Sequence, residues 1–140
     1  MKTLLIFAQI MLSSIQPNNQ SAGNLNIKVI GIPSTKGNLM VAIYNKEEGF
    51  REKDKTFRNL IEIAQKGTME VNINQLPAGN YAVAVYHDAN GNGKLDKNVF
   101  GIPTEYYGFS NDAKGSFGPP AFDACKFNFS GGKSITINLK

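Results

Sequence analysis

The sequence predicts an all-β fold, a single antiparallel β-sandwich of about seven strands with one long loop rich in glycine and aromatic residues. Two observations favour it. Short segments with alternating or continuous apolar character recur along the chain, and Gly, Pro and Asn separate them. A convincing helical period is not kept by any stretch of ten or more residues, with the weak exception of residues 47–63. The length of 140 residues fits one such domain, which we expect over residues 23–140.

The predicted strands are rich in β-branched residues, which fit a pleated, half-buried surface. They cover residues 25–32, 39–44, 60–64, 69–73, 81–86, 122–129 and 134–139. Between the second and third of these, Phe50, Phe57 and Leu60 could line either a short helix or an irregular crossover.

One turn sharpens the predicted architecture. Pro77 presets its own φ, and Gly79 can adopt a positive φ without steric cost, so residues 76–81 form a turn that leads into a strand. Tyr81 begins that strand and can donate a hydrogen bond back to the turn, as in the tyrosine corner of Greek-key sandwiches. This pattern favours a prealbumin- or immunoglobulin-like sandwich.

The N-terminal residues 1–22 have the features of a signal peptide. Lys2 supplies a positive start, and an uncharged apolar run of residues 3–15 precedes a polar Asn/Gln/Ser spacer. The run is shorter than the roughly 20 residues that a membrane-spanning helix needs. We therefore expect an exported protein, periplasmic or extracellular, that does not span a membrane. The alternative is a buried N-terminal helix.

Composition excludes several classes of protein. The charged fraction of 19% is too low for a charge-swollen disordered chain. The net charge is +4, but the chain has no run of five or six like charges, so nucleic acid is not an expected partner. A single cysteine, Cys125, excludes a disulfide scaffold and a four-Cys zinc site. Cys125 is expected to be a small buried apolar residue rather than a reactive thiol.

A loop of alternating oxygen-bearing residues follows the strand that contains His87. Counted from Asp88, these residues occupy positions 1, 3, 5 and 9, with Gly93 at position 6. This is the spacing of an EF-hand-type calcium loop, in which the glycine allows the turn that brings the position-7 carbonyl, here of Lys94, toward the ion. The predicted calcium ligands are therefore Asp88, Asn90, Asn92, Lys94 and Asp96.

The loop departs from the EF-hand pattern at position 12. Val99 stands where the bidentate Glu would be, so Glu105 or Asp112 would have to complete the shell. Two charged ligands predict weak binding, on the order of 0.1–1 mM, as in extracellular modules. The alternative is an Asn-Gly hairpin turn that holds no ion.

The segment after this loop is long and unusual. Between Asp88 and Phe122 no strand is evident, and the segment contains six glycines and three prolines. Eight of the fourteen aromatic residues lie within residues 100–129. Because disordered segments are poor in aromatics, we expect an ordered loop over residues 97–122. We expect this loop to present Tyr106, Tyr107 and Phe109, which together with His87 on the preceding strand would form a ligand surface.

The combined motifs resemble a family of exported bacterial proteins, domain-of-unknown-function family 2141. The matching runs begin H-D-x-N-x-N-G-x-x-D at His87 and continue as G-I-P-x-E-x-Y-G-F-S-N from Gly101 and P-P-x-F from Pro119. With the turn at residues 76–81, the resemblance extends over residues 25–139. It implies an exported, prealbumin-like sandwich and supplies no activity or substrate.

Three functional hypotheses follow. The favoured one is a calcium-binding, non-enzymatic module whose aromatic loop binds a ligand or another component of the cell envelope. The second is a purely structural or assembly domain without a metal. The third is a hydrolase-type enzyme that uses His87 with Ser110 or Glu105. Against the third, His87 and Asp88 are neighbours on a strand and should point to opposite faces, so Asp88 would not orient His87 as in a catalytic triad.

Overall fold

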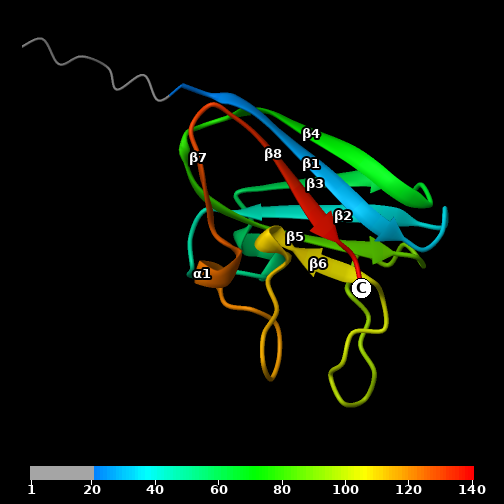
Figure 1. Cartoon of the computed structure of the whole chain (residues 1–140). Helices are drawn as coiled ribbons and strands as arrows, with labels where there is room; N and C mark the ends of the chain where they lie inside the picture. Colours follow the sequence, from blue (N-terminus) through cyan, green and yellow to red (C-terminus); the bar gives the residue numbers. More distant parts are fainter. Residues whose placement is uncertain (1–20) are drawn as a thin grey trace, which may run out of the picture.

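The computed structural model describes residues 21–140 and shows two packed β-sheets, which confirms the all-β sandwich prediction (Figure 1). The predicted signal peptide falls almost entirely on residues 1–20, outside the described residues. Within residues 21–140, no helix has the length and apolar character needed to cross a membrane.

The first sheet has three strands in the order β4–β1–β8. The central strand β1 (Gly23–Ile32) pairs antiparallel with β4 (Gly67–Leu76) and parallel with β8 (Gly132–Asn138). The sequence predicts an antiparallel sandwich, and the parallel pair of β1 with β8 is an exception to that prediction. The parallel pair is possible because nearly the whole domain lies between its two strands and serves as the crossover connection.

The second sheet carries the loops of interest. Its order is β3 (Arg58–Ile63), β2 (Asn38–Tyr44), β5 (Gly79–Asp88) and β6 (Tyr107–Phe109). The long strand β5 has two partners along the same edge, because β6 pairs with its second half and β7 (Phe127–Phe129) pairs with its beginning. The chain between β6 and β7 is thus tied at both ends to β5.

Two local predictions were wrong, and a third stretch follows one of its two predicted alternatives. The predicted strand over residues 122–129 is divided into a one-turn helix α1 (Phe122–Cys125) and the three-residue strand β7. The segment 97–122, expected to lack strands, contains β6 and the 3₁₀ turn η2 (Ser110–Asp112), which brings the total over residues 21–140 to eight strands. Between β2 and β3 the chain forms an irregular crossover with the short 3₁₀ turn η1 (Lys53–Lys55), which is one of the two alternatives predicted for this stretch.

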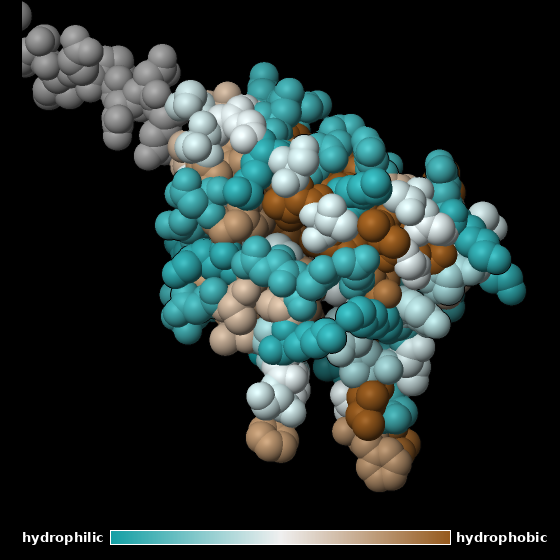
Figure 2. All heavy atoms as spheres, viewed as in Figure 1, coloured by the Kyte–Doolittle hydropathy of each residue, from teal (hydrophilic) through white to brown (hydrophobic). Residues whose placement is uncertain are grey.

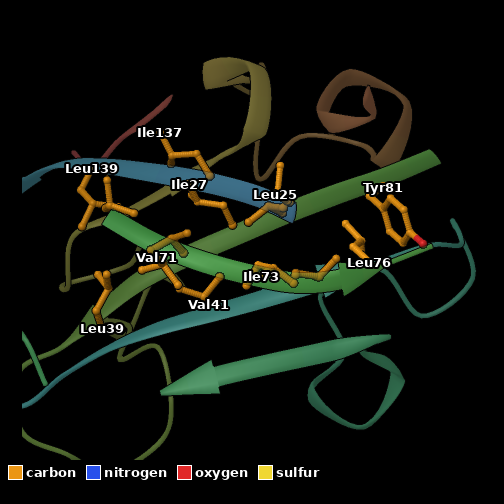
Figure 3. Close-up of a cluster of buried hydrophobic side chains, with 14 of the residues drawn as sticks. Leu25, Ile27, Leu39, Val41, Val71, Ile73, Leu76, Tyr81, Ile137 and Leu139 are labelled. Atoms are coloured by element: carbon orange, nitrogen blue, oxygen red, sulfur yellow. The ribbon is translucent and has the colours of Figure 1, made fainter. Parts of the chain in front are cut away.

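The main core lies between the two sheets (Figure 3). Alternate residues of each strand point inward, as the two-residue period of a strand requires. Tyr81 closes one end of this core, and its hydroxyl donates to the carbonyl oxygen of Pro77 at 2.9 Å, which confirms the predicted tyrosine corner. Residues that form the core include Leu25, Ile27, Leu39, Val41, Val71, Ile73, Leu76 and Ile137.

A second, aromatic cluster covers part of the outer face of the five-stranded sheet. Phe50 is at its centre, with ring centroids 5.2 Å from Tyr44 and 5.5 Å from Phe122. Phe109 and Cys125 are buried in the same cluster. Cys125 has no exposed surface, which agrees with its expected role as a small buried residue. This cluster anchors α1 against the sheet.

Candidate metal-binding loop and adjoining groove

The candidate loop starts where β5 ends, and Asp88 organises its first turn. The residue is only 1% exposed. Its carboxylate accepts backbone N–H groups from Asn92 at 3.1 Å and from Gly93 at 2.7 Å. The backbone can curl around the carboxylate in this way because Gly91 and Gly93 adopt φ values of +71° and +73°.

The next three oxygen-bearing side chains contact one another. The Asn90 side-chain oxygen accepts the Asn92 N–H at 3.2 Å, and that of Asn92 accepts the Lys94 N–H at 2.9 Å. Their amide nitrogens both donate to the carboxylate of Asp96, at 2.6 Å from Asn90 and at 2.9 Å from Asn92. The structure therefore brings four of the five predicted ligands, Asp88, Asn90, Asn92 and Asp96, into one hydrogen-bonded network.

Glu105, predicted as an additional ligand, connects the two ends of the loop. One of its carboxylate oxygens accepts the N–H of Ala89 at 3.1 Å, and the other accepts the N–H of Asp96 at 3.0 Å. It thus fixes the backbone on which Asp96 is placed. Asp112, the other residue considered for the shell, instead binds the backbone and side chain of Asn138 at 2.9 and 2.7 Å.

The base of the loop is electronegative. Burial raises the pKa of Tyr86 to about 12, and the charges of Asp88, Glu105 and Asp96 add to this effect. On the opposite side, the ammonium of Lys53 donates to the carbonyl oxygen of Gly93 at 3.3 Å. Over residues 21–140, no three His, Cys, Asp or Glu side chains form a cluster suited to a metal ion. A cation here would depend on amide and backbone oxygens beside two carboxylates.

His87 and Ser110 satisfy their hydrogen bonds separately. His87 is 2% exposed, and its Nε2 lies 2.7 Å from the carbonyl oxygen of Lys36. Ser110 is buried, accepts the Val83 N–H at 2.9 Å and donates to the Cys125 carbonyl oxygen at 2.6 Å. Val83 and His87 are four residues apart on β5, a separation of roughly 13 Å. The geometry gives no support to a pair of His87 with Ser110.

A groove of about 590 Å³ lies over the outer face of the five-stranded sheet, beside the candidate loop. Of the predicted ligand surface, Tyr107 and Phe109 line this groove, whereas Tyr106 is exposed but does not line it. His87 is buried and contributes no accessible surface, which corrects that part of the prediction. Sequence reasoning missed the rest of the lining, which includes Tyr44, Tyr86, Arg51, Lys97, Phe100 and Phe117.

The sequence of two strands contains a pattern that indicates these missed groove residues. Ala42 and Tyr44 on β2, and Ala84 and Tyr86 on β5, alternate with inward-facing core residues, so both faces of these strands are apolar. A strand with two apolar faces indicates that something covers the second face. Here the aromatic cluster covers part of that face, and the groove leaves another part accessible.

Comparison with protein-family models matches residues 27–138 to DUF2141, described as an uncharacterised protein conserved in bacteria. No curated protein matches the chain. No solved structure matches it either, so the likeness to prealbumin stays a prediction.

Proposed function

The chain belongs to the DUF2141 family of uncharacterised bacterial proteins, and we propose that it is an exported module that binds calcium in the loop of residues 88–96. Export rests on the signal-peptide pattern of residues 1–22. The observation that carries the calcium proposal is the convergence of Asn90 and Asn92 on Asp96, one turn away from the buried carboxylate of Asp88.

Calcium binding requires a small rearrangement of this network. The amide groups of Asn90 and Asn92 now direct nitrogen toward Asp96, and nitrogen is not a calcium ligand. Rotation of each amide by about half a turn around its last side-chain bond exchanges nitrogen for oxygen without moving the backbone, and it breaks the bonds that the two side-chain oxygens accept from the N–H groups of Asn92 and Lys94. The two amide oxygens would then face the same point as Asp96, together with Asp88 and the Lys94 carbonyl.

The loop also forms one wall of the groove. Leu95 and Lys97 line it, and they follow the predicted ligands directly in the chain. A bound ion that fixes Asp96 would therefore also fix this wall against the aromatic floor formed by Tyr107 and Phe109. We propose that the groove takes an apolar ligand, or an apolar segment of another envelope component, and that the protein is not an enzyme.

A second candidate function is a structural domain without a metal. The observation that favours it is that the amides of Asn90 and Asn92 satisfy the Asp96 carboxylate, so the loop is a complete hydrogen-bonded turn without an ion. The two candidates differ in a measurable property, because only the first predicts that added calcium stabilises the fold.

The test is thermal melting during a calcium titration, with a magnesium titration beside it. For a dissociation constant near 0.5 mM, about 10 mM calcium stabilises the protein by roughly 1.8 kcal/mol, which raises Tm by roughly 5–10 °C. Asp96→Asn should abolish the rise. Asp123→Asn, the same chemical change at an exposed carboxylate on α1, should keep it. If calcium does not change the Tm of the unmodified protein, the calcium proposal fails and the second candidate, a structural domain without a metal, remains.

A further inference from the structure

Two loops project from the same side of the molecule and end in apolar residues (Figure 2). They are residues 97–103 and 113–120, here called the tip loops, and both contribute to the walls of the groove. Val99 is 95% exposed, Phe100 is 84% exposed, and Phe117 is fully exposed. Such exposure of large apolar side chains to water is unfavourable, and grouped in this way it marks an interaction site.

The first tip loop is a closed turn that holds its apolar residues outward. Its backbone is tied by hydrogen bonds from Gly101 N–H to the Asn98 carbonyl oxygen and from Asn98 N–H to the Ile102 carbonyl oxygen, both 2.9 Å. The Asn98 side chain accepts the N–H groups of Phe100 and Ile102 at 3.0 and 3.1 Å. These hydrogen bonds fix the backbone of the turn, and the turn directs its apolar side chains outward.

The second tip loop is equally compact. A Cβ at Gly115 would lie 2.0 Å from the Gly118 carbonyl oxygen, so only glycine allows the two sides of this loop to approach each other. Phe117 stands at the bend between them. The close contact between Gly115 and Gly118 makes the loop narrow, and the ring of Phe117 lies at its end.

The charges near the tips have one sign. Residues 97–103 and 113–120 contain Lys97 and Lys114 and no acidic residue. Acidic groups lie only at the bases of these loops, where they accept hydrogen bonds: Asp96 from Asn90 and Asn92, Glu105 from backbone N–H groups, and Asp112 from Asn138. Lys114 also lies beside Lys140, whose side chain lowers the pKa of Lys114, while the charge of Asp112 opposes this effect. The lysines of the tip loops, Lys97 and Lys114, favour a negatively charged partner.

The shape of the tips distinguishes between partners. A rigid protein partner would need a separate pocket for each projecting ring, at the right spacing. A lipid surface deforms around inserted side chains and needs no such match, and anionic headgroups complement lysines beside the inserted groups.

We propose that the tip loops dock the protein on an anionic lipid surface, with Val99, Phe100 and Phe117 inserted among the acyl chains and Lys97 and Lys114 at the headgroups. These residues lie outside the candidate calcium loop of residues 88–96, so the proposal does not depend on calcium.

The test is flotation of the domain without the predicted signal peptide, residues 23–140, with vesicles of equal parts phosphatidylglycerol and phosphatidylcholine, and with vesicles of phosphatidylcholine alone. Both are run with calcium and with chelator. The unmodified protein should float with the anionic vesicles in either condition. Phe100→Ser and Phe117→Ser should each weaken partitioning roughly tenfold, the value of one buried aromatic side chain at the interface. The matched control Ile61→Ser/Ile63→Ser removes exposed apolar residues from β3 and should bind like the unmodified protein.

The lysines are tested separately. Lys97→Gln/Lys114→Gln should reduce binding to the anionic vesicles only, and Lys28→Gln/Lys66→Gln, which removes two charges elsewhere, should change it less. Unchanged melting temperatures show that the variants fold. Absence of flotation by the unmodified protein, or equal flotation of Phe100→Ser/Phe117→Ser, would overturn the proposal. The proposal would also be overturned if the protein does not float but forms dimers that Phe100→Ser/Phe117→Ser abolishes. The tip loops would then bind a second copy of the chain.

Discussion

The side-chain amide of Asn92 donates to both carboxylate oxygens of Asp96, at 2.9 and 3.1 Å. The three residues between these partners include the turn at Gly93, so the contact closes the loop across its own bend. The same two side chains would have to face a bound calcium ion with oxygen alone. The orientation of this amide therefore distinguishes the two states: nitrogen faces Asp96 in the metal-free loop, and oxygen would face the ion in the metal-bound loop.

Asp88 and Asp96 should differ in their effect on stability without calcium. Asp88→Ala removes the acceptor of two backbone N–H groups from a buried position and should cost about 2–4 kcal/mol. Asp96→Ala removes only contacts to exposed amides and should cost about 1 kcal/mol or less. Urea unfolding in chelator measures both. Equal costs would contradict the structural role assigned to Asp88.

Glu105 should act on the backbone of the loop rather than as a calcium ligand. Glu105→Gln keeps one oxygen acceptor and loses the other, so the N–H of either Ala89 or Asp96 loses its partner. We expect a loss of about 1 kcal/mol and faster hydrogen exchange at one of these two amides. Glu48→Gln, an exposed position, is the control. Exchange that is unchanged at both amides would refute the assignment.

Tyr86 should make the protein sensitive to alkaline pH. Its pKa is raised to about 12 by burial and by the charges of Asp88, Glu105 and Asp96, so folding favours the neutral hydroxyl. This contribution is fully present below about pH 10 and is lost as the pH rises from 10 through 12.

Urea unfolding at pH 8 and pH 11 measures this sensitivity. Tyr86→Phe should lose about 1 kcal/mol less stability between the two pH values than the unmodified protein. Tyr106→Phe, at an exposed tyrosine, should follow the unmodified protein. The same pH loss in Tyr86→Phe as in the unmodified protein would contradict the prediction.

Cys125 should be unreactive in the folded protein. Burial raises the pKa of its thiol to about 11, so very little thiolate exists at pH 8, and the sulfur has no exposed surface. Alkylation at pH 8 should be at least about a hundredfold slower in the folded protein than in urea. Because Cys125 is the only cysteine, mass spectrometry reads the rate directly. Rapid labelling of the native protein would show that the aromatic cluster opens.

The fold could be predicted largely because its longer strands have strong local patterns. The apolar run at residues 39–44 and the turn before Tyr81 both indicated the strands that the structure contains. Strand β6 was missed because three residues do not establish a period, and its formation depends on pairing with distant residues such as Ala84. The helix α1 is too short to show a helical pattern for the same reason.

The candidate site was predictable in part. The spacing of Asp88, Asn90, Asn92 and Asp96 predicted the loop whose side chains the structure joins. The function of Glu105 at the ends of the loop could not be predicted, because eight residues lie between it and Asp96 and the chain between them returns through a separate turn. The position of Phe117 opposite Phe100 likewise results from how two separate loops leave the sheet.

The most direct measurement of calcium binding is a crystal structure of the protein grown in calcium chloride. The proposal predicts one ion with oxygens of Asp88, Asn90, Asn92, Lys94 and Asp96 at about 2.3–2.6 Å, and both amides turned so that oxygen faces the ion. A loop that holds no ion, with the amide nitrogens of Asn90 and Asn92 still on Asp96, would contradict it.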